Sequence, residues 1–329
     1  MKPPQIMVIP LFVLLLVAGC IKSESSNTNL DNRTQDMTKS KENTKTPSIT
    51  ITPQNNDKTL PLIIAHRGAR SLSPENTIAA AKKALEIGAD LWELDVAVTS
   101  DNELVVLHDD TLDRTCDVKD KYPGKVPWRV WEFTLEELKT LDCGTWFINT
   151  DPFGQIKKGN VSEEELESYR GEKMPTLSEA LTFTHENHWR VNIELKDQFL
   201  DQYDSVIVER TVALIEELGM DDGIQVVISS FNHEYLRMVK ELNPNIPIQM
   251  LTSVKINNLS EYLKLYGTDS CNPKIDVWSK QDLEQLGKEG IKFNIWTVND
   301  PATMNELIDI HVAGIFTDYP QLLKGILYP

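Results

Sequence analysis

The stretch Leu62-Ile63-Ile64-Ala65-His66-Arg67-Gly68 is an apolar run of strand length that ends directly in charged residues. Similar apolar runs return along the chain, and most are followed by a stretch with helical spacing. A strand followed by a helix, repeated many times, indicates βα units around a parallel sheet. A strand at 62–66 would therefore carry His66 and Arg67 to the edge where the carboxyl ends of such strands meet.

Eight strands are expected, and they favour a closed barrel. They are predicted at 62–66, 90–98, 191–196, 224–231, 246–252, 271–277, 291–298 and 313–317. Helices are predicted at 75–88, 134–141, 176–187, 201–219, 233–242, 257–266, 280–289, 301–310 and 320–326. Eight such units are typical of the (β/α)8 TIM barrel, an α/β fold of ~250 residues. A doubly wound open sheet is the alternative, but no Gly-x-Gly-x-x-Gly follows any of these strands.

Two segments depart from the repeat. Residues 104–107 are expected to be an extra extended segment outside the barrel. Residues 109–175 contain several Pro, Gly and Trp residues and lack the repeating pattern. They are predicted to form a small inserted subregion after the second barrel strand, as a lid or a substrate collar over one rim.

The first residues indicate export. Lys2 precedes an apolar run from Ile6 to Ala18, which is shorter than the roughly 20 residues of a membrane-spanning helix. Val17-Ala18-Gly19-Cys20 then resembles the cleavage site of a lipoprotein signal. We expect residues 1–19 to be a signal peptide and Cys20 to be acylated. The protein would then be an exported lipoprotein, anchored to the cell membrane and facing the extracytoplasmic side.

Composition separates a tether from the folded part. Residues 20–60 are mostly polar or charged, so they are predicted to be a disordered tether before a domain at 61–329. The chain has 33 Lys and Arg against 50 Asp and Glu, a formal net charge of −17. This acidity argues against a nucleic-acid partner, since such binding depends on Lys and Arg that neutralise phosphates. The sequence leaves the oligomeric state open.

Three cysteines follow Cys20, at positions 116, 143 and 271, and none forms a Cys-x-x-Cys pair. This spacing disfavours a zinc site. One disulfide is possible outside the cytoplasm, and buried or free thiols are equally compatible with the pattern, so the sequence does not decide between them.

Glu93 and Asp95 are candidate metal ligands. They are two residues apart, so in a strand their carboxylates face the same side. Glu194 and Lys196 repeat this spacing in the next expected barrel strand. Three carboxylates at one rim form an oxygen site suited to one divalent cation, Ca²⁺ or Mg²⁺. A buried ion-pair network among these four residues is the alternative.

His66 and His108 each follow an apolar segment, and imidazole can both take and give a proton near neutral pH. Two histidines therefore suit the base and the acid of one displacement. A lone histidine at a strand end is more often structural, but neighbouring charged residues favour function for this pair. Arg67 offers a planar fork to phosphate oxygens and Lys196 a point charge, so both are predicted to bind substrate.

Two further pairs are of interest. Phe231 and Trp296 come late in expected strands and are predicted to pack on the carbon skeleton of a substrate, with core packing as the alternative for Phe231. Glu75 and Asn76 either support the site or serve the first turn of the helix at 75–88, where Ser73 is expected as the N-cap.

Together these segments resemble the glycerophosphodiester phosphodiesterase family, over residues 61–327. The motifs that carry the resemblance are His66-Arg67-Gly68, Pro74-Glu75-Asn76-Thr77, Glu93-x-Asp95, His108-Asp109-x-Thr111-Leu112-Asp113-Arg114-Thr115, Ile193-Glu194-Leu195-Lys196, Trp296-Thr297-Val298-Asn299 and Thr317-Asp318-Tyr319-Pro320.

The resemblance implies a β/α barrel that hydrolyses glycerophosphodiesters to an alcohol and glycerol 3-phosphate with a divalent cation. It implies metal binding by Glu93, Asp95 and Glu194. It also implies acid/base catalysis by His66 and His108, and phosphate contacts by Arg67 and Lys196. Two alternatives stay open: a phospholipase D-like or C-like enzyme that acts on lysolipids, and a surface-tethered barrel that binds glycerophosphodiesters without catalysis.

Overall fold

The computed structural model describes residues 60–329. The expected signal peptide at 1–19, Cys20 and the tether up to residue 59 lie outside the described residues. Within 60–329, no helix is both long enough and apolar enough to cross a membrane.

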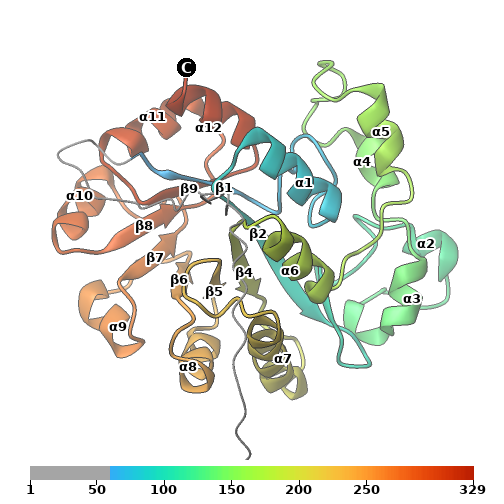
Figure 1. The fold of residues 1–329 in the computed structure, drawn as a ribbon, viewed down its shortest axis with the longest axis horizontal. Coiled ribbons are helices and arrows are strands. Elements are labelled where there is room, and N and C mark those ends of the chain that lie inside the picture. Colours follow the sequence, from blue (N-terminus) through green and yellow to red (C-terminus); the bar gives the residue numbers. More distant parts are fainter. Residues whose placement is uncertain (1–59) are drawn as a thin grey trace, which may run out of the picture. The chain divides into compact units, whose positions relative to one another are not determined.

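Eight parallel strands close into a barrel (Figure 1). They are β1 (Leu62–Ala65), β2 (Leu91–Val98), β4 (Val191–Leu195), β5 (Val226–Ser230), β6 (Ile248–Thr252), β7 (Ser270–Pro273), β8 (Lys292–Ile295) and β9 (Gly314–Thr317). Each pairs with the next, and β9 pairs back with β1. The predicted TIM barrel is confirmed, and every barrel strand overlaps its predicted range. The short β3 (Leu104–Val106) runs antiparallel to β2 outside the barrel, as expected.

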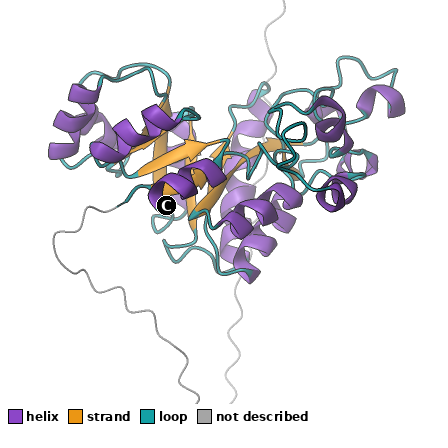
Figure 2. Cartoon of the chain, turned by 90° about the horizontal axis from the view of Figure 1, so that it is seen from above, coloured by secondary structure: helices purple, strands orange, loops and turns teal. Residues whose placement is uncertain are grey.

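A helix follows each barrel strand along the chain, and these helices surround the sheet (Figure 2). They are α1 (Ile78–Ile87), α6 (Leu177–Glu186), α7 (Asp204–Glu217), α8 (His233–Leu242), α9 (Leu259–Leu265), α10 (Lys280–Lys288), α11 (Pro301–Asp309) and α12 (Pro320–Leu327). Their apolar faces cover the outer face of the barrel. Ala80, Ala81 and Ala84 of α1, for example, are fully buried.

The start of α1 differs from the expectation. Ser73 is not its N-cap: Thr77 is, and its side chain accepts a hydrogen bond from the Ala80 backbone N–H. Asn76 adopts a left-handed conformation with φ 57°, so the helix cannot extend back through it. Glu75 and Asn76 therefore belong to the loop between β1 and α1 rather than to the helix.

Part of the barrel interior below the strand ends is polar, beside an apolar cluster that includes Ile64, Val227 and Phe316. Side chains alternate along a strand, so Asn192 shares the inward face with Glu194, and its neighbour Ser229 donates to its Oδ1 at 2.6 Å. Asn192 and Asn272 both donate to Gln249 Oε1, at 2.9 and 2.8 Å. Asn294 donates in turn to Asn272 at 2.9 Å. Hydrogen bonds between their own side chains thus link Asn192, Ser229, Gln249, Asn272 and Asn294 into an amide floor.

The inserted region lies between β3 and α6 and folds around a small apolar core of its own that includes Phe133, Leu138 and Leu141. Its helices are α2 (Val118–Lys121), α3 (Leu135–Thr140), α4 (Thr145–Thr150) and α5 (Glu163–Tyr169), with a 3₁₀ turn at Val130–Glu132. Only α3 was expected. The segments that form α2, α4 and α5 show no clear helical period in the sequence, so these helices were not predicted.

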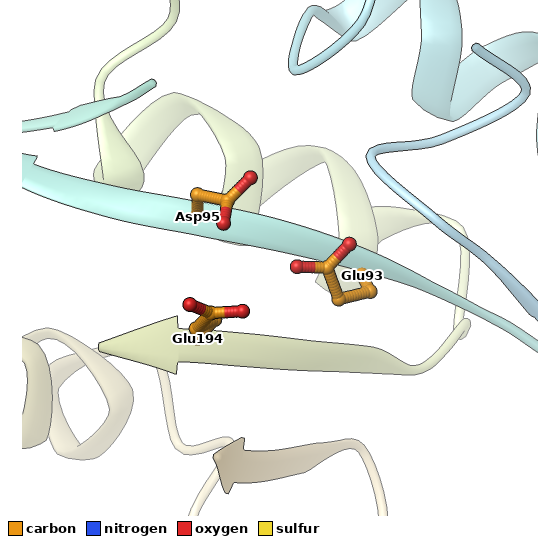
Figure 3. A group of neighbouring side chains, drawn as sticks. All are labelled: Glu93, Asp95 and Glu194. Carbon is orange, nitrogen blue, oxygen red and sulfur yellow. The ribbon is translucent and has the colours of Figure 1, made fainter. Parts of the chain in front are cut away.

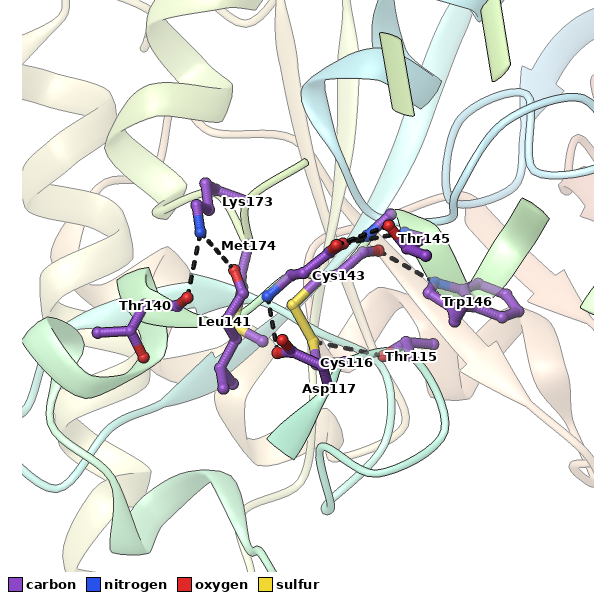
Figure 4. Close-up of a disulfide and its surroundings, with 12 residues drawn as sticks. Thr115, Cys116, Asp117, Thr140, Leu141, Cys143, Thr145, Trp146, Lys173 and Met174 are labelled. Carbon is purple, nitrogen blue, oxygen red and sulfur yellow. Dashed lines mark hydrogen bonds between the residues drawn. A yellow bond between two sulfur atoms is a disulfide. The ribbon is translucent and has the colours of Figure 1, made fainter. Parts of the chain in front are cut away.

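A disulfide joins Cys116 to Cys143 inside this region (Figure 4). The two are separated by 27 residues along the chain, and closing a loop of that size stabilises the folded state by about 3.5 kcal/mol relative to the reduced chain. Cys271 is buried in β7 and is a free thiol. The choice that the sequence left open is thus resolved for these three cysteines.

Candidate active site

A cavity of about 240 Å³ opens at the carboxyl ends of the barrel strands. It is lined by His66, Arg67, Glu93, His108, Glu194, Lys196, Ser229, Phe231, Leu251, Trp296, Thr297 and Phe316. Every catalytic and substrate-binding residue predicted from the sequence lines it, as do two of the three predicted metal ligands. A larger cavity of about 610 Å³ lies at the opposite, amino ends of the strands and holds none of these residues.

Three carboxylates from two neighbouring strands face one another at this cavity (Figure 3). Asp95 on β2 is the register partner of Glu194 on β4, and Glu93 precedes Asp95 on the same face. One oxygen from each lies within 4.8 Å of the others. Within residues 60–329, one buried oxygen of each carboxylate has no hydrogen-bond partner. Buried oxygens without a donor are costly unless a cation meets them, so the group fits a metal ion.

The pKa shifts of the three carboxylates also favour a bound cation. Burial, together with the charges of Asp95 and Glu194, raises the pKa of Glu93 well above its usual value. Burial and the charge of Asp95 also raise the pKa of Glu194. Burial would raise the pKa of Asp95 as well, but Arg67, His108 and Lys196 hold it below its ordinary value. Full ionisation of all three therefore needs a further positive charge, and a hard divalent ion supplies it.

The protein holds the second carboxylate oxygen of Glu93 and of Asp95. The Arg67 backbone N–H donates to Glu93 at 2.8 Å, and the Asn76 side chain donates to Asp95 at 2.8 Å. Lys196 Nζ lies 3.2 Å from Glu194 Oε1, the oxygen of that carboxylate that has no hydrogen-bond partner in the described part of the chain. The hydrogen bonds to Glu93 and Asp95 fix the rotation of those two carboxyl groups and leave the other oxygen of each without a partner among residues 60–329.

The turn that presents Arg67 depends on a glycine. Arg67 and Gly68 both have positive φ, 55° and 78°. A Cβ at residue 68 would lie 2.6 Å from the Ala80 carbonyl carbon, so only glycine lets the turn pack against α1. The buried Arg67 side chain then reaches Glu75 at 2.8 Å and Asp95 at 3.3 Å.

Each cavity histidine is bound to a carboxylate through Nδ1. His66 pairs with Asp318 at 2.7 Å, and His108 with Asp109 at 2.6 Å. A carboxylate on Nδ1 holds a proton there and leaves Nε2 free for chemistry. Burial lowers the pKa of His66, and the charge of Arg67 adds to this against the opposing Asp318 bond. His66 is therefore neutral at pH 7, the form that a base requires.

The apolar wall of the cavity is aromatic. Phe231 and Trp296 meet edge to face with their ring centroids 5.5 Å apart. Trp296 donates through Nε1 to the Asn272 carbonyl at 2.7 Å, which fixes the indole above the amide floor. Phe231 is 42% exposed, so it lines the cavity rather than packing in the core.

Comparison with known proteins identifies the family. The model of the glycerophosphoryl diester phosphodiesterase family matches residues 66–322. The chain belongs to this family. It is 37% identical over 269 residues to a glycerophosphodiester phosphodiesterase of Caldanaerobacter subterraneus subsp. tengcongensis, over 81% of this chain and 97% of the relative. A glycerophosphodiester phosphodiesterase of Bacillus subtilis is 33% identical, over 80% and 86% of the two chains.

Solved structures agree with this glycerophosphodiester phosphodiesterase assignment. An Oleispira antarctica phosphodiesterase in complex with the product sn-glycerol-3-phosphate matches with a TM-score of 0.67 and 25% identity. The match covers 82% of this chain and 98% of that one. The family resemblance inferred from the sequence motifs is thus confirmed.

The sequence did not predict which residues of this phosphodiesterase contact Glu75. Its buried carboxylate contacts Arg67 at 2.8 Å, Arg70 at 2.8 Å and Arg114 at 2.7 Å. Arg70 stood in no motif, and Arg114 stood in the His108 motif without a role. Burial would raise the pKa of Glu75, but the Arg114 hydrogen bond and the charges of Arg67 and Arg70 lower it to about 2.

The low pKa of Glu75 predicts a specific dependence of stability on pH. A carboxylate whose pKa falls from 4.5 to about 2 on folding adds roughly 3 kcal/mol above pH ~4.5, which is lost as the pH falls towards 2. The Glu75→Gln variant should lose about that much at pH 7 and should show a weaker loss between pH 5 and 3. Urea unfolding of the variant and the wild type at pH 7, 5 and 3 measures both changes. Glu167→Gln, an exposed control, should match the wild type; equal pH slopes for Glu75→Gln and wild type would contradict the assignment.

Proposed function

We propose that this protein is a metal-dependent glycerophosphodiester phosphodiesterase that releases an alcohol and glycerol 3-phosphate by histidine acid/base catalysis. One observation carries the proposal: three buried carboxylates gather within 4.8 Å of one another, and two of them line the same cavity as two histidines whose Nδ1 atoms are bound to carboxylates. The named activity of the relatives and the product bound to the Oleispira enzyme support the substrate class.

The cavity offers complementary groups for such a substrate. Lys196 lines it and is only partly exposed, which suits a charge contact with a phosphoryl oxygen. Arg67 lines it from the β1 side. Phe231 and Trp296 form the apolar wall, where the three-carbon skeleton of the glycerol would pack while its hydroxyl groups face the polar side.

We assign the metal to Glu93, Asp95 and Glu194. A divalent ion bound there would polarise the phosphoryl group and offset the charge that develops on it. The protein supplies the rest of the site: Lys196 faces Asp95 and Glu194 at 3.9 and 3.2 Å and adds a second positive charge near the phosphoryl oxygens. Calcium and magnesium both suit three carboxylates, so the choice between them is left to the experiment below.

In the proposed reaction His66 takes a proton from the nucleophile and His108 gives one to the leaving group. The nucleophile is water or, as we favour, the neighbouring glycerol hydroxyl, which is already held on the substrate. Its oxygen forms a new P–O bond, the P–O bond to the alcohol breaks, and the departing oxygen takes the proton from His108. A cyclic phosphate formed in this way is then opened by water, with the two histidines in exchanged roles.

The metal assignment predicts loss of turnover on chelation. Release of glycerol 3-phosphate from glycerophosphocholine should stop with excess chelator and return when Ca²⁺ or Mg²⁺ is restored separately. Glu194→Gln should weaken metal binding at least tenfold in calorimetry, whereas Glu284→Gln on the surface should not. Full activity without metal would refute the assignment.

Turnover of lysophosphatidylcholine in place of glycerophosphocholine would favour the phospholipase-like alternative, and binding without turnover would favour the non-catalytic barrel.

The role of His108 has a separate test. His108→Ala should lower kcat for glycerophosphocholine by on the order of 10² to 10⁴, the usual contribution of a general acid or base. Its melting temperature and metal affinity should stay near those of the wild type, because the ring is partly exposed. His311→Asn, at an exposed position with positive φ, serves as the control. Retained activity in His108→Ala would remove its assigned role.

We also propose that the protein is exported and anchored to the cell membrane through an acylated Cys20. The apolar run before Cys20 supports this, and so does the Cys116–Cys143 disulfide, since disulfides persist mainly in oxidising compartments outside the cytoplasm. In the source cells, or in an expression host that processes lipoproteins, the wild type should sediment with membranes. Mass spectrometry should find an acyl group on the wild type and none on a Cys20→Ser variant. An unmodified Cys20 in the wild type would contradict the proposal.

A further inference from the structure

The two cavity histidines differ in how firmly their carboxylate partners are held. Asp318, the partner of His66, is nearly buried and accepts a second hydrogen bond from the Asn299 side chain at 2.7 Å. The Asp318 backbone N–H also donates to the Asn299 side chain at 2.9 Å. Asp109, the partner of His108, is partly exposed, and the second oxygen of its carboxylate accepts a hydrogen bond from Arg114 Nε. The orientation of His108 therefore depends on Arg114.

Arg114 uses its whole guanidinium group as a bridge. Nε meets Asp109, while Nη1 and Nη2 meet the two oxygens of Glu75 at 3.0 and 2.7 Å. This paired contact fixes the plane of the group more firmly than a single hydrogen bond would. The guanidinium also lies over the Trp146 ring, 5.8 Å from its centroid.

Glu75 gives this bridge a rigid anchor. It is only 5% exposed and is held from the other side by Arg67 and Arg70. Arg70 in turn approaches Asp318 at 3.5 Å. A continuous chain of ion pairs thus joins the two histidines, in the order His66, Asp318, Arg70, Glu75, Arg114, Asp109, His108.

The inserted region places Arg114 in this chain. Arg114 stands two residues before Cys116, whose disulfide to Cys143 ties the segment to the start of α4 (Figure 4). The Trp146 side chain donates to the Cys143 carbonyl at 3.0 Å, which holds the indole beneath the guanidinium. Glu75, His108, Cys116 and Cys143 all border one narrow void of about 10 Å³, so little space is left for this part of the loop to shift.

We infer that Arg114 is a positioning residue for the proposed reaction: it holds Asp109 so that His108 presents Nε2 to the oxygen of the leaving alcohol. This inference rests on the proposed function and adds to it a role for the inserted region, which was expected only to act as a lid or collar. It also makes the effect of Arg114 depend on how much the leaving group needs a proton.

The test compares two substrates of the wild type and of Arg114→Ala. The leaving group of glycerophosphocholine is the choline alkoxide, which needs the proton of His108, whereas that of the p-nitrophenyl ester of glycerol 3-phosphate is the stable nitrophenolate. Arg114→Ala should lower kcat/KM, which reports the steps up to release of the leaving group, about ten- to a hundredfold for glycerophosphocholine and less than about threefold for the nitrophenyl ester. Millimolar guanidinium should restore part of the lost turnover, since the vacated position is partly open to solvent.

Two further variants keep the comparison decisive. Arg114→Lys retains a positive charge without the paired contact, so it should show the same selective loss and serves if the alanine variant fails to fold. Arg170→Ala, which removes an exposed arginine of the same region that pairs with Glu167, should match the wild type for both substrates. If the Arg114→Ala variant lost activity equally on both substrates, or lost none, Arg114 would serve only to stabilise the inserted region, and the inference would be overturned. A wild type that hydrolyses neither substrate would overturn the proposed function itself.

Discussion

Mutual repulsion among three buried carboxylates is the constraint that the rest of this structure serves. The register of β2 on β4 sets Asp95 beside Glu194, and the strand period adds Glu93 on the same face. Buried like charges are tolerated only where positive charge surrounds them. Arg67 after β1 and Lys196 after β4 supply part of this positive charge, and the space between the oxygens leaves room for a cation that supplies the rest. Parallel strands whose carboxyl ends converge make this gathering possible.

Much of this arrangement could be predicted from the sequence, because it follows from strand geometry. Apolar runs located all eight barrel strands, and a two-residue period placed Glu93 and Asp95 on one face whatever the register of the neighbouring strand. Residues at strand ends such as His66 meet in the mouth of any closed barrel. The convergence of the cavity residues therefore needed no knowledge of individual contacts, only of the fold class and of the chain direction in each strand.

The partners of the charged groups could not be predicted in this way. Arg70 and Arg114 reach Glu75 from segments that follow no repeating pattern, so their proximity arises from loop conformations that periodicity does not encode. The same holds for the pairing of Cys116 with Cys143, which depends on the path of the inserted region. The late start of α1 at Ile78 was missed because Ser73 and Pro74 imitate a helix start, whereas the left-handed Asn76 turns its side chain to Asp95.

The amide floor under the cavity has a consequence for how the protein can change over time. Asn192, Gln249, Asn272 and Asn294 each satisfy a neighbour, so replacing one with an aliphatic residue strands a donor or an acceptor on the next. Gly314 adds a steric condition, because a side chain there would meet Asn294. Substitutions in this layer should therefore be accepted only when several floor residues change together. The residues around the head group can vary in evolution while the amide floor beneath them stays the same.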